Sequence, residues 1–167
     1  LKDKIALVTG STKGIGLETA KILYNEGCKL IINGRSDKNI KIILDEMPGT
    51  LFVKGDVTNN LDIKKIIQKI EKNFDKIDIL VCNVGYSSSV SPGEENLKEW
   101  EKIFLLNFFA TTNIIEKTKN LLALNKGVIT CISSICGLEV IPSAPLTYSS
   151  AKAALNSYVL GISRPLG

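Results

Sequence analysis

A tyrosine and a lysine four residues apart are the first candidates for chemistry in this sequence. Tyr148 and Lys152 lie in residues 147–163, which have helical spacing, so the two side chains would share one helix face. An ammonium about 4 Å from a phenol contributes up to ~4 kcal/mol, which would lower the tyrosine pKa from about 10 by as much as ~3. Tyr148 would then titrate nearer neutral pH, as a general acid or base should. The spacing alone also arises by chance.

The absence of histidine restricts this chemistry to other residue types. None of the 167 residues is a histidine, so the chain holds no Ser-His-Asp or Cys-His catalytic system. The commonest metal ligand is also missing, and we expect a site without metal. Acid–base chemistry must therefore come from Tyr, Lys, Cys, Asp or Glu.

Two polar residues are candidates to assist the tyrosine and the lysine. Ser134 follows a predicted strand, where open α/β sheets bind ligands; it either donates a hydrogen bond to a substrate oxygen or is an ordinary loop serine. Asn107 interrupts the apolar residues 103–109. A buried amide must find hydrogen-bond partners. Asn107 either holds a water that links Lys152 to solvent or bonds backbone groups at an irregular turn of the helix.

A glycine-rich turn joins the first predicted strand to the first predicted helix. Gly10 permits the tight turn, Gly14 lets the backbone approach a pyrophosphate, and Gly16 lets the helix pack closely on the strand. The helix N-terminus adds unpaired N–H groups and the positive end of the helix dipole. A turn without a ligand is the weaker alternative, because the turn stands between a strand and a helix. The predicted phosphate-binding residues are Gly10, Ser11, Thr12, Lys13, Gly14, Ile15 and Gly16.

The residues after the second predicted strand favour NADP(H) over NAD(H). An NAD site has a carboxylate here for the ribose 2′-hydroxyl. This segment instead has Arg35, which can pair with a 2′-phosphate, and Lys13 can add a second cation. Asp37 follows closely and is interpreted as a helix cap; as a ribose ligand it would favour NAD(H).

Two more segments complete the predicted nucleotide site. Asp56 and Val57 follow the third predicted strand, and Asp56 either holds the edge of the adenine ring or serves an ordinary turn. Asn83 and Gly85 end the fourth predicted strand. Gly85 would allow close approach of the cofactor and Asn83 would satisfy loop backbone groups, with a purely structural turn as the alternative.

The elements that must position these residues alternate along the chain. Strands separated by helices form right-handed crossovers, so we predict one α/β domain over residues 1–167 with a doubly wound, Rossmann-like parallel sheet. The fifth strand would be an uncovered edge, and we expect the natural polypeptide to continue with at least one more strand. Apolar runs predict strands at residues 4–9, 28–32, 51–53, 77–82 and 127–133, and helical spacing predicts helices at residues 15–25, 36–47, 60–73, 94–124 and 147–163.

Composition excludes several other classes of protein. The net charge is +4, and the lysines are interspersed with acidic residues, so we expect solvated helix faces and no nucleic-acid partner. No apolar run approaches the roughly 18–20 residues of a membrane-spanning helix, and we expect no membrane partner. The four cysteines form no Cys-x-x-Cys motif, which favours buried free thiols in a reducing compartment, the cytoplasm.

Taken together, these motifs resemble the short-chain dehydrogenase/reductase family. They stand in the family's order over essentially the whole chain: Thr9-Gly10-x-x-x-Gly14-Ile15-Gly16, Asp56-Val57, Asn83-Val84-Gly85, Asn107, Ile132-Ser133-Ser134 and Tyr148-x-x-x-Lys152. The resemblance implies hydride transfer between NADP(H) and the carbonyl or alcohol carbon of a small molecule. It implies Tyr148 as proton donor or acceptor, and Lys152 as the residue that lowers its pKa and binds the nicotinamide ribose. It further implies that Ser134 orients the carbonyl, that Asn107 supports a water relay, and that the protein is a homodimer or homotetramer.

The sequence departs from the family's pattern in three places. Cys82 and Val84 replace the asparagine and alanine common after the fourth strand. The interval from Ser134 to Tyr148 is one residue longer than usual, so Ser133 is an alternative to Ser134. The family's final strands and most of its substrate-binding segment are absent from this chain. A dinucleotide-binding module that senses redox state without turnover, or an inactive fragment, are therefore the alternative functions.

Overall fold

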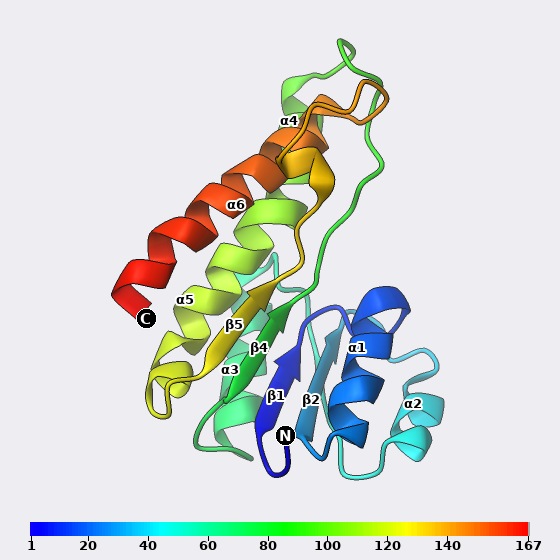
Figure 1. The fold of residues 1–167 in the computed structure, drawn as a ribbon. Coiled ribbons are helices and arrows are strands. Elements are labelled where there is room, and N and C mark those ends of the chain that lie inside the picture. Colours follow the sequence, from blue (N-terminus) through cyan, green and yellow to red (C-terminus); the bar gives the residue numbers. More distant parts are fainter. Residues whose placement is uncertain (167) are drawn as a thin grey trace.

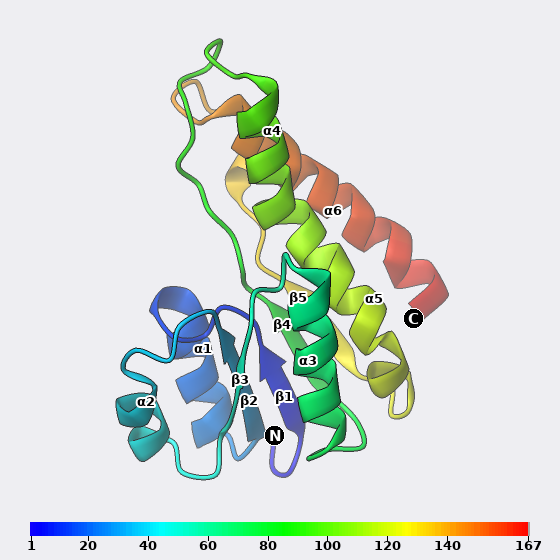
Figure 2. The same ribbon diagram turned by 180° about the vertical axis from the view of Figure 1, so that it is seen from behind.

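Five short parallel strands form the sheet on which every candidate site is built. The computed structural model describes residues 1–166, and the strands are β1 (Ile5–Val8), β2 (Lys29–Gly34), β3 (Leu51–Lys54), β4 (Ile79–Cys82) and β5 (Val128–Cys131). Their order across the sheet is β3-β2-β1-β4-β5 (Figures 1 and 2). The chain winds outward from β1 to β3 and then returns to pair β4 with the other side of β1. The predicted α/β fold with a doubly wound parallel sheet is confirmed.

Central strands of this sheet are buried on both faces, as the continuous apolar runs predict. All four residues of β1 are buried, and Leu7 lies opposite Ile31 of β2 and Leu80 of β4. A parallel strand covered by helices on both sides has no polar face to present, which explains the lack of alternation in its sequence.

Helices cover both faces of the sheet (Figures 1 and 2). Side chains of α1 and α2 pack on the face that carries Ala6 and Val8. Side chains of α3, α5 and α6 pack on the opposite face, which carries Leu7 and Leu80. The helices are α1 (Gly14–Asn25), α2 (Ile40–Glu46), α3 (Asn60–Glu71), α4 (Leu97–Phe104), α5 (Ala110–Ala123) and α6 (Leu146–Leu166), with a π-helix η1 (Leu105–Phe109) and a short 3₁₀ helix η2 (Ile135–Gly137).

The single helix predicted over residues 94–124 is wrong in one important respect. The segment begins as α4 at Leu97, widens into the π-helix η1 around Asn107, and resumes as α5 at Ala110. A π-turn inserts one extra residue into the helical ladder and turns a side chain to a new direction. Helical spacing of apolar residues gave no sign of this insertion.

The cap predicted for the second helix is also wrong. Helix α2 begins at Ile40, after Asn39 in a left-handed conformation with φ +66°, and no side chain caps it. The carboxylate of Asp37 pairs instead with the ammonium of Lys54 at 2.9 Å, and this hydrogen bond lowers the pKa of Asp37. The Ser36 hydroxyl accepts a hydrogen bond from the Lys38 N–H, so it closes a local turn.

Loops at one edge of the sheet build the region of interest. The segment after β4, helix α4 and the start of α6 all extend past the carboxyl ends of β4 and β5 (Figure 1). In open α/β sheets, ligands bind at this edge, at the point where the strand order reverses. Here that point lies between β1 and β4. Within residues 1–166, no helix has both the length and the apolar character needed to cross a membrane.

Candidate active site

The glycine turn after β1 has the backbone that the sequence predicts. Gly10 and Gly14 have φ of +61° and +57°, in the left-handed region that favours glycine. A side chain on Gly16 would overlap the Asn83 amide and the Gly10 carbonyl, so only glycine lets α1 lie this close to the turn. The position of a Cβ on Gly14 faces open space instead, which leaves the backbone there accessible to a ligand.

Two asparagines hold this turn against the neighbouring strands. Asn33 of β2 is buried; its amide donates to the carbonyls of Val53 and Gly55, and its backbone carbonyl accepts from the Ser11 N–H at 2.8 Å. Asn83, just past β4, donates to the carbonyls of Thr9 and Gly10, both at 3.1 Å. The predicted support of the loop backbone by Asn83 is therefore observed, whereas the role of Asn33 was missed because nothing in the sequence shows how far its amide reaches.

Side chains of the turn divide into buried supports and exposed residues. The Ser11 hydroxyl is buried and donates to the Val8 carbonyl at 2.7 Å, so it serves the turn itself. Thr12 occupies the space that a side chain on Gly34 would need. Lys13 and Ile15 are exposed, and no side chain caps the N-terminus of α1. The open backbone at Gly14 and the uncapped helix end fit a pyrophosphate.

Charged groups near β2 and β3 surround the predicted place of the adenosine. The guanidinium of Arg35 is largely exposed and lies 3.6 Å from the Asp56 carboxylate. That carboxylate also accepts hydrogen bonds from the Thr58 N–H and hydroxyl, as in an ordinary turn. Val57 is buried in the core, so its side chain supports the turn from below. Arg35 is free to swing toward an added phosphate, since its ion pair is long and solvent-exposed.

Tyr148 and Lys152 meet on one face of α6, as their spacing predicts. The Lys152 ammonium lies 5.9 Å from the centre of the Tyr148 ring. It donates a hydrogen bond of 2.7 Å to the Ile132 carbonyl, just past β5, so α6 is fastened to the carboxyl edge of the sheet. Thr147, which sequence reasoning missed, is fully buried and donates to the Ser89 hydroxyl at 3.0 Å. This contact ties the first turn of α6 to the loop after β4.

Lys152 is a buried charge. Only 3% of the residue is exposed, and burial lowers the pKa of its ammonium below the ordinary value, although nearby Cys131 acts in the opposite direction. Because burial of a charge costs stability, a buried lysine with a shifted pKa is a candidate for a functional site.

Asn107 and Gly85 complete the surroundings of the lysine. The Asn107 amide donates to the carbonyls of Tyr86 and Ile103, and its oxygen accepts from the Tyr86 N–H, so it satisfies the backbone at η1 and holds the loop after β4. The predicted helix irregularity is thus observed; a water relay through Asn107 stays a prediction. A Cβ on Gly85 would lie 3.0 Å from the Asn107 oxygen and 3.5 Å from the Lys152 ammonium.

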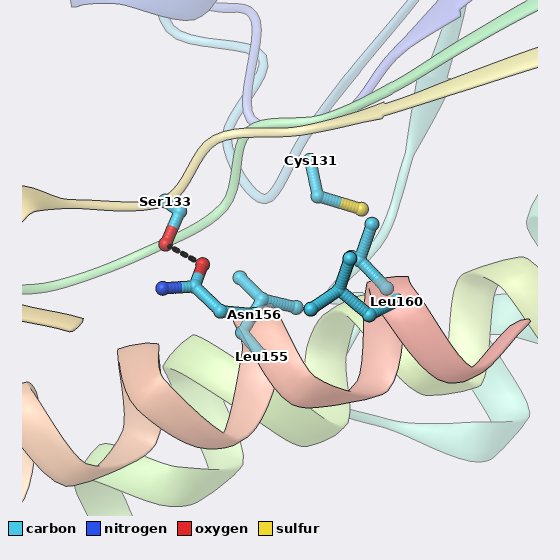
Figure 3. Close-up of a pocket in the computed structure, with 6 residues that line it drawn as sticks. Cys131, Ser133, Leu155, Asn156 and Leu160 are labelled. Carbon is cyan, nitrogen blue, oxygen red and sulfur yellow. Dashed lines mark hydrogen bonds between the residues drawn. The ribbon is translucent and has the colours of Figure 1, made fainter. Parts of the chain in front are cut away.

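The two candidate serines have different surroundings. The Ser133 hydroxyl donates to the Asn156 side chain of α6 at 2.6 Å (Figure 3). The Ser134 hydroxyl accepts from the Cys136 N–H at the start of η2, and its own proton has no acceptor among the hydrogen bonds of the described residues. Ser134 therefore has a donor to offer a ligand, whereas Ser133 already uses its own.

The two halves of the site are joined by the three residues after β4. A Cβ on Gly10 would lie 2.9 Å from the Val84 side chain, and a Cβ on Gly85 would lie against Lys152. The glycine turn and the Tyr148–Lys152 pair therefore lie at the same side of the sheet, past the carboxyl ends of its strands. A doubly wound sheet with a glycine turn at its switch point, and a tyrosine and lysine beside it, is typical of the class of dinucleotide-dependent oxidoreductases.

Comparison with known proteins places the chain more narrowly. Residues 4–167 match the model of the short chain dehydrogenase family. The chain belongs to this family, whose members are oxidoreductases. It is 33% identical, over 99% of its length and 73% of the relative's, to an uncharacterized oxidoreductase of Staphylococcus saprophyticus. It is 32% identical to an uncharacterized oxidoreductase of Schizosaccharomyces pombe, over 96% of the chain and 64% of that relative.

Solved structures show the same fold. A short-chain type dehydrogenase/reductase from Mycobacterium marinum superposes with a TM-score of 0.91 at 24% identity, over 99% of this chain and 70% of that one. The RhlG/NADP active-site complex of Pseudomonas aeruginosa gives a TM-score of 0.91 at 24% identity, over 99% of this chain and 68% of that one. These relatives therefore have sequence beyond the part that this chain matches.

Proposed function

We propose that the protein is an NADP(H)-dependent reductase or dehydrogenase that interconverts the carbonyl and alcohol forms of a small molecule. The observation that carries this proposal is the junction after β4, where Asn83 holds the glycine turn and a Cβ on Gly85 would meet Asn107 and Lys152. A dinucleotide bound by its phosphates at the turn would extend along this edge toward Tyr148.

The residues that would hold the dinucleotide follow from the geometry of the turn. Backbone N–H groups around Gly14 and at the start of α1 would bind the pyrophosphate, with Lys13 beside them. The exposed Arg35 would pair with the 2′-phosphate in exchange for Asp56. Lys152 would donate to the nicotinamide ribose. The RhlG structure was solved with NADP, which supports the same cofactor here.

The chain's own residues would position the substrate and move one proton. When bound, the nicotinamide supplies or accepts the hydride. The Ser134 hydroxyl would donate to the substrate oxygen and hold it near the Tyr148 hydroxyl. In reduction, the Tyr148 oxygen would give its proton to that oxygen, and the Lys152 ammonium would stabilise the phenolate left behind. In oxidation the same proton would return to Tyr148.

Replacement of the tyrosine tests the proposal. The Tyr148→Phe variant of the full polypeptide should lose at least ~100-fold in kcat with any accepted carbonyl substrate, since general acid–base catalysis contributes about 10²–10⁴-fold. It should still bind NADPH, measured by fluorescence titration. Tyr24→Phe removes a hydroxyl that bonds to the Pro48 carbonyl at the far side of the sheet, and it should leave kcat unchanged.

Three results would overturn the proposal in different ways. Wild-type protein that binds NADPH but turns over no member of a carbonyl and alcohol panel would be a redox-sensing module. Wild-type protein that binds neither NADPH nor NADH would be an inactive fragment. Turnover that survives in Tyr148→Phe would show that another group moves the proton.

The choice of cofactor has its own test. Arg35→Ala should raise the KM for NADPH by about 10- to 100-fold, because a charge-assisted hydrogen bond contributes about 1.5–3 kcal/mol, and leave the KM for NADH unchanged. Lys41→Ala, an exposed cation of α2, is the matched control. An equal loss for both cofactors would assign Arg35 to the pyrophosphate or to the fold.

We also propose that two or four copies of the protein associate. Leu97, Leu105 and Phe109 lie on α4 and η1 and are 73%, 41% and 47% exposed. Large apolar side chains on neighbouring helices are typical of a subunit interface. Sedimentation analysis of the full polypeptide should give a dimer or tetramer, and a Phe109→Glu substitution should shift it to monomer.

A further inference from the structure

Two cysteines lie side by side at the ends of β4 and β5, near Lys152 of the candidate site. Cys82 ends β4, Cys131 ends β5, and the two are register partners in the sheet. Side chains at partner positions of adjacent strands project from the same face, and Cα atoms of neighbouring strands lie about 4.8 Å apart. That spacing is within the range of about 4.4–6.8 Å that a disulfide spans. Both cysteines are free thiols in the structure.

Within the described residues, Cys131 is the member of the pair that a small molecule can reach. Cys82 is 2% exposed, whereas Cys131 is only partly buried. Cys131 lines a pocket of about 280 Å³ between β5 and α6, together with Ser133, Leu155, Asn156, Val159 and Leu160. Figure 3 shows its sulfur pointing from the end of β5 toward the α6 side chains that line the pocket. Hydrogen peroxide, which has two oxygen atoms, is far smaller than this space.

The charges around the pair favour the thiolate at Cys131. Contact with the Cys82 thiol lowers the pKa of Cys131, burial opposes this effect, and the positive charge of Lys152 adds to the lowering. The same contact between the thiols, together with burial, raises the pKa of Cys82. One member of the pair therefore resembles an attacking thiolate and the other a protonated thiol that can follow it.

We propose that Cys131 and Cys82 form a site of reversible oxidation by peroxides, in which Cys131 reacts first and Cys82 resolves it to a disulfide. The Cys131 thiolate attacks one peroxide oxygen, the O–O bond breaks, and hydroxide leaves and takes up a proton as water. The Cys82 sulfur then attacks the Cys131 sulfur, the S–O bond of the sulfenic acid breaks, and the second water leaves with the Cys82 proton. Two thiols lose two electrons in total, and one hydrogen peroxide becomes two waters.

The other two cysteines are not placed to form a disulfide with Cys82 or Cys131. Cys28 lies just before the amino end of β2, whereas Cys82 and Cys131 lie at the carboxyl ends of their strands. The Cys28 thiol contacts the Leu1 carbonyl. Cys136 lies in η2, beyond the end of β5. Neither is a register partner of Cys82 or Cys131. The site does not depend on the proposed oxidoreductase activity, because its product is a covalent bond that can be measured without turnover.

Hydrogen peroxide and mass spectrometry test the site in the full polypeptide. Treatment of the folded protein should reduce its free thiols by two, and tryptic digestion should join the peptide of residues 77–98 to that of residues 127–152. Because the second peptide also holds Cys136, the digestion is repeated with Cys136→Ala, in which the same link should form. Dithiothreitol should restore all the thiols. A link that disappears in Cys136→Ala, or a thiol count that peroxide does not change, would overturn the proposal.

Single replacements test the order of the two steps. In Cys82→Ala, Cys131 should stop at the sulfenic acid, and dimedone should label the peptide of residues 127–152 in the Cys136→Ala background. In Cys131→Ala, Cys82 should remain a free thiol, because it is buried and has lost its partner. Cys28→Ala is the matched control and should form the link as the wild type does. Dimedone labelling of Cys82 in Cys131→Ala would reverse the assigned roles.

Discussion

At the scale of single residues, the site depends on a lysine held in a place that is unfavourable for its charge. Lys152 is almost fully buried, and the Ile132 carbonyl is the acceptor of its short hydrogen bond. Because the carbonyl belongs to the backbone just past β5, a shift of the ammonium would break this hydrogen bond. This arrangement keeps a positive charge beside the Tyr148 ring at the cost of some stability.

The lowered pKa of Lys152 predicts how that cost depends on pH. Burial lowers the pKa in the folded protein, whereas the unfolded chain keeps the ordinary lysine value, so the unfolded state binds more protons between the two pKa values. Wild-type stability should therefore rise through this window as the pH increases toward about 10.4, the ordinary lysine pKa. In Lys152→Met the contribution of this lysine to the pH dependence should be absent. Urea unfolding at a series of pH values measures both, with Lys41→Met as the exposed control; parallel curves for wild type and Lys152→Met would contradict the prediction.

A substitution at Gly85 should change the activity without changing the fold. An added methyl would lie 3.0 Å from the Asn107 oxygen, which must give way by a few tenths of an ångström, and in ordinary contact with the Lys152 ammonium at 3.5 Å. Gly85→Ala should lower kcat by about tenfold or more, because a small misplacement of positioned groups is costly. Gly161→Ala, where nothing lies within 4 Å of the new methyl, is the matched control and should leave kcat unchanged. Equal kcat for wild type and Gly85→Ala would show that the crowding is harmless.

The residues of the site were only partly predictable. The glycine turn, Asn83 and the Tyr148–Lys152 pair follow from fixed spacing within one element or one turn, and the structure has them where the spacing puts them. Asn33, Thr147 and the Cys82–Cys131 pair depend on which strands and loops become neighbours. That information is not contained in any single segment, so their contacts could not be anticipated.

At the scale of elements, the π-helix η1 positions Asn107 and, through it, the loop after β4. It turns the buried Asn107 so that its amide reaches the Tyr86 backbone across the loop after β4. The same amide also donates to the Ile103 carbonyl, one turn earlier in the helix. Asn107 thus fixes both the helix and the loop that carries Gly85. Apolar periodicity predicted the helix correctly but not this widening, because one inserted residue barely alters the pattern.

Loss of this amide should destabilise the protein strongly. In Asn107→Leu the carbonyls of Tyr86 and Ile103 and the Tyr86 N–H lose their partner, which should cost about 2–4 kcal/mol of the free energy of unfolding. Asn120→Leu, an exposed position of α5, should change it by less than about 0.5 kcal/mol. Chemical unfolding of the two variants beside the wild type measures the difference. A loss of the same size in both would mean that η1 does not depend on its asparagine.

At the scale of the whole molecule, the sheet order sets where everything meets. The doubly wound order was predictable from alternating apolar runs and helices, since right-handed crossovers leave few other topologies. The reversal between β1 and β4 then places the glycine turn beside the loop after β4. The opposite end of the same two strands is joined by Asp78, which the sequence did not mark. Its carboxylate accepts from the Ile5 N–H and the Asn125 amide, and it pairs with the ammonium groups of Lys4 and Lys76.

Asp78 should make the fold sensitive to acid. Burial alone would raise the pKa of this carboxylate, but the Ile5 N–H and the ammonium groups of Lys4 and Lys76 outweigh it and lower the pKa below the ordinary value. Its stabilisation is therefore complete above about pH 4, the ordinary aspartate pKa, and is lost as the pH falls through the lower folded value. Asp78→Asn should cost about 1–3 kcal/mol at neutral pH, and the gap to wild type should narrow below about pH 4. Asp45→Asn, at an exposed position of α2, should show no gap that changes with pH. Urea unfolding between acid and neutral pH distinguishes these outcomes, and a gap that stays constant into acid would mean that Asp78 joins β1 to β4 by its shape and not by its charge.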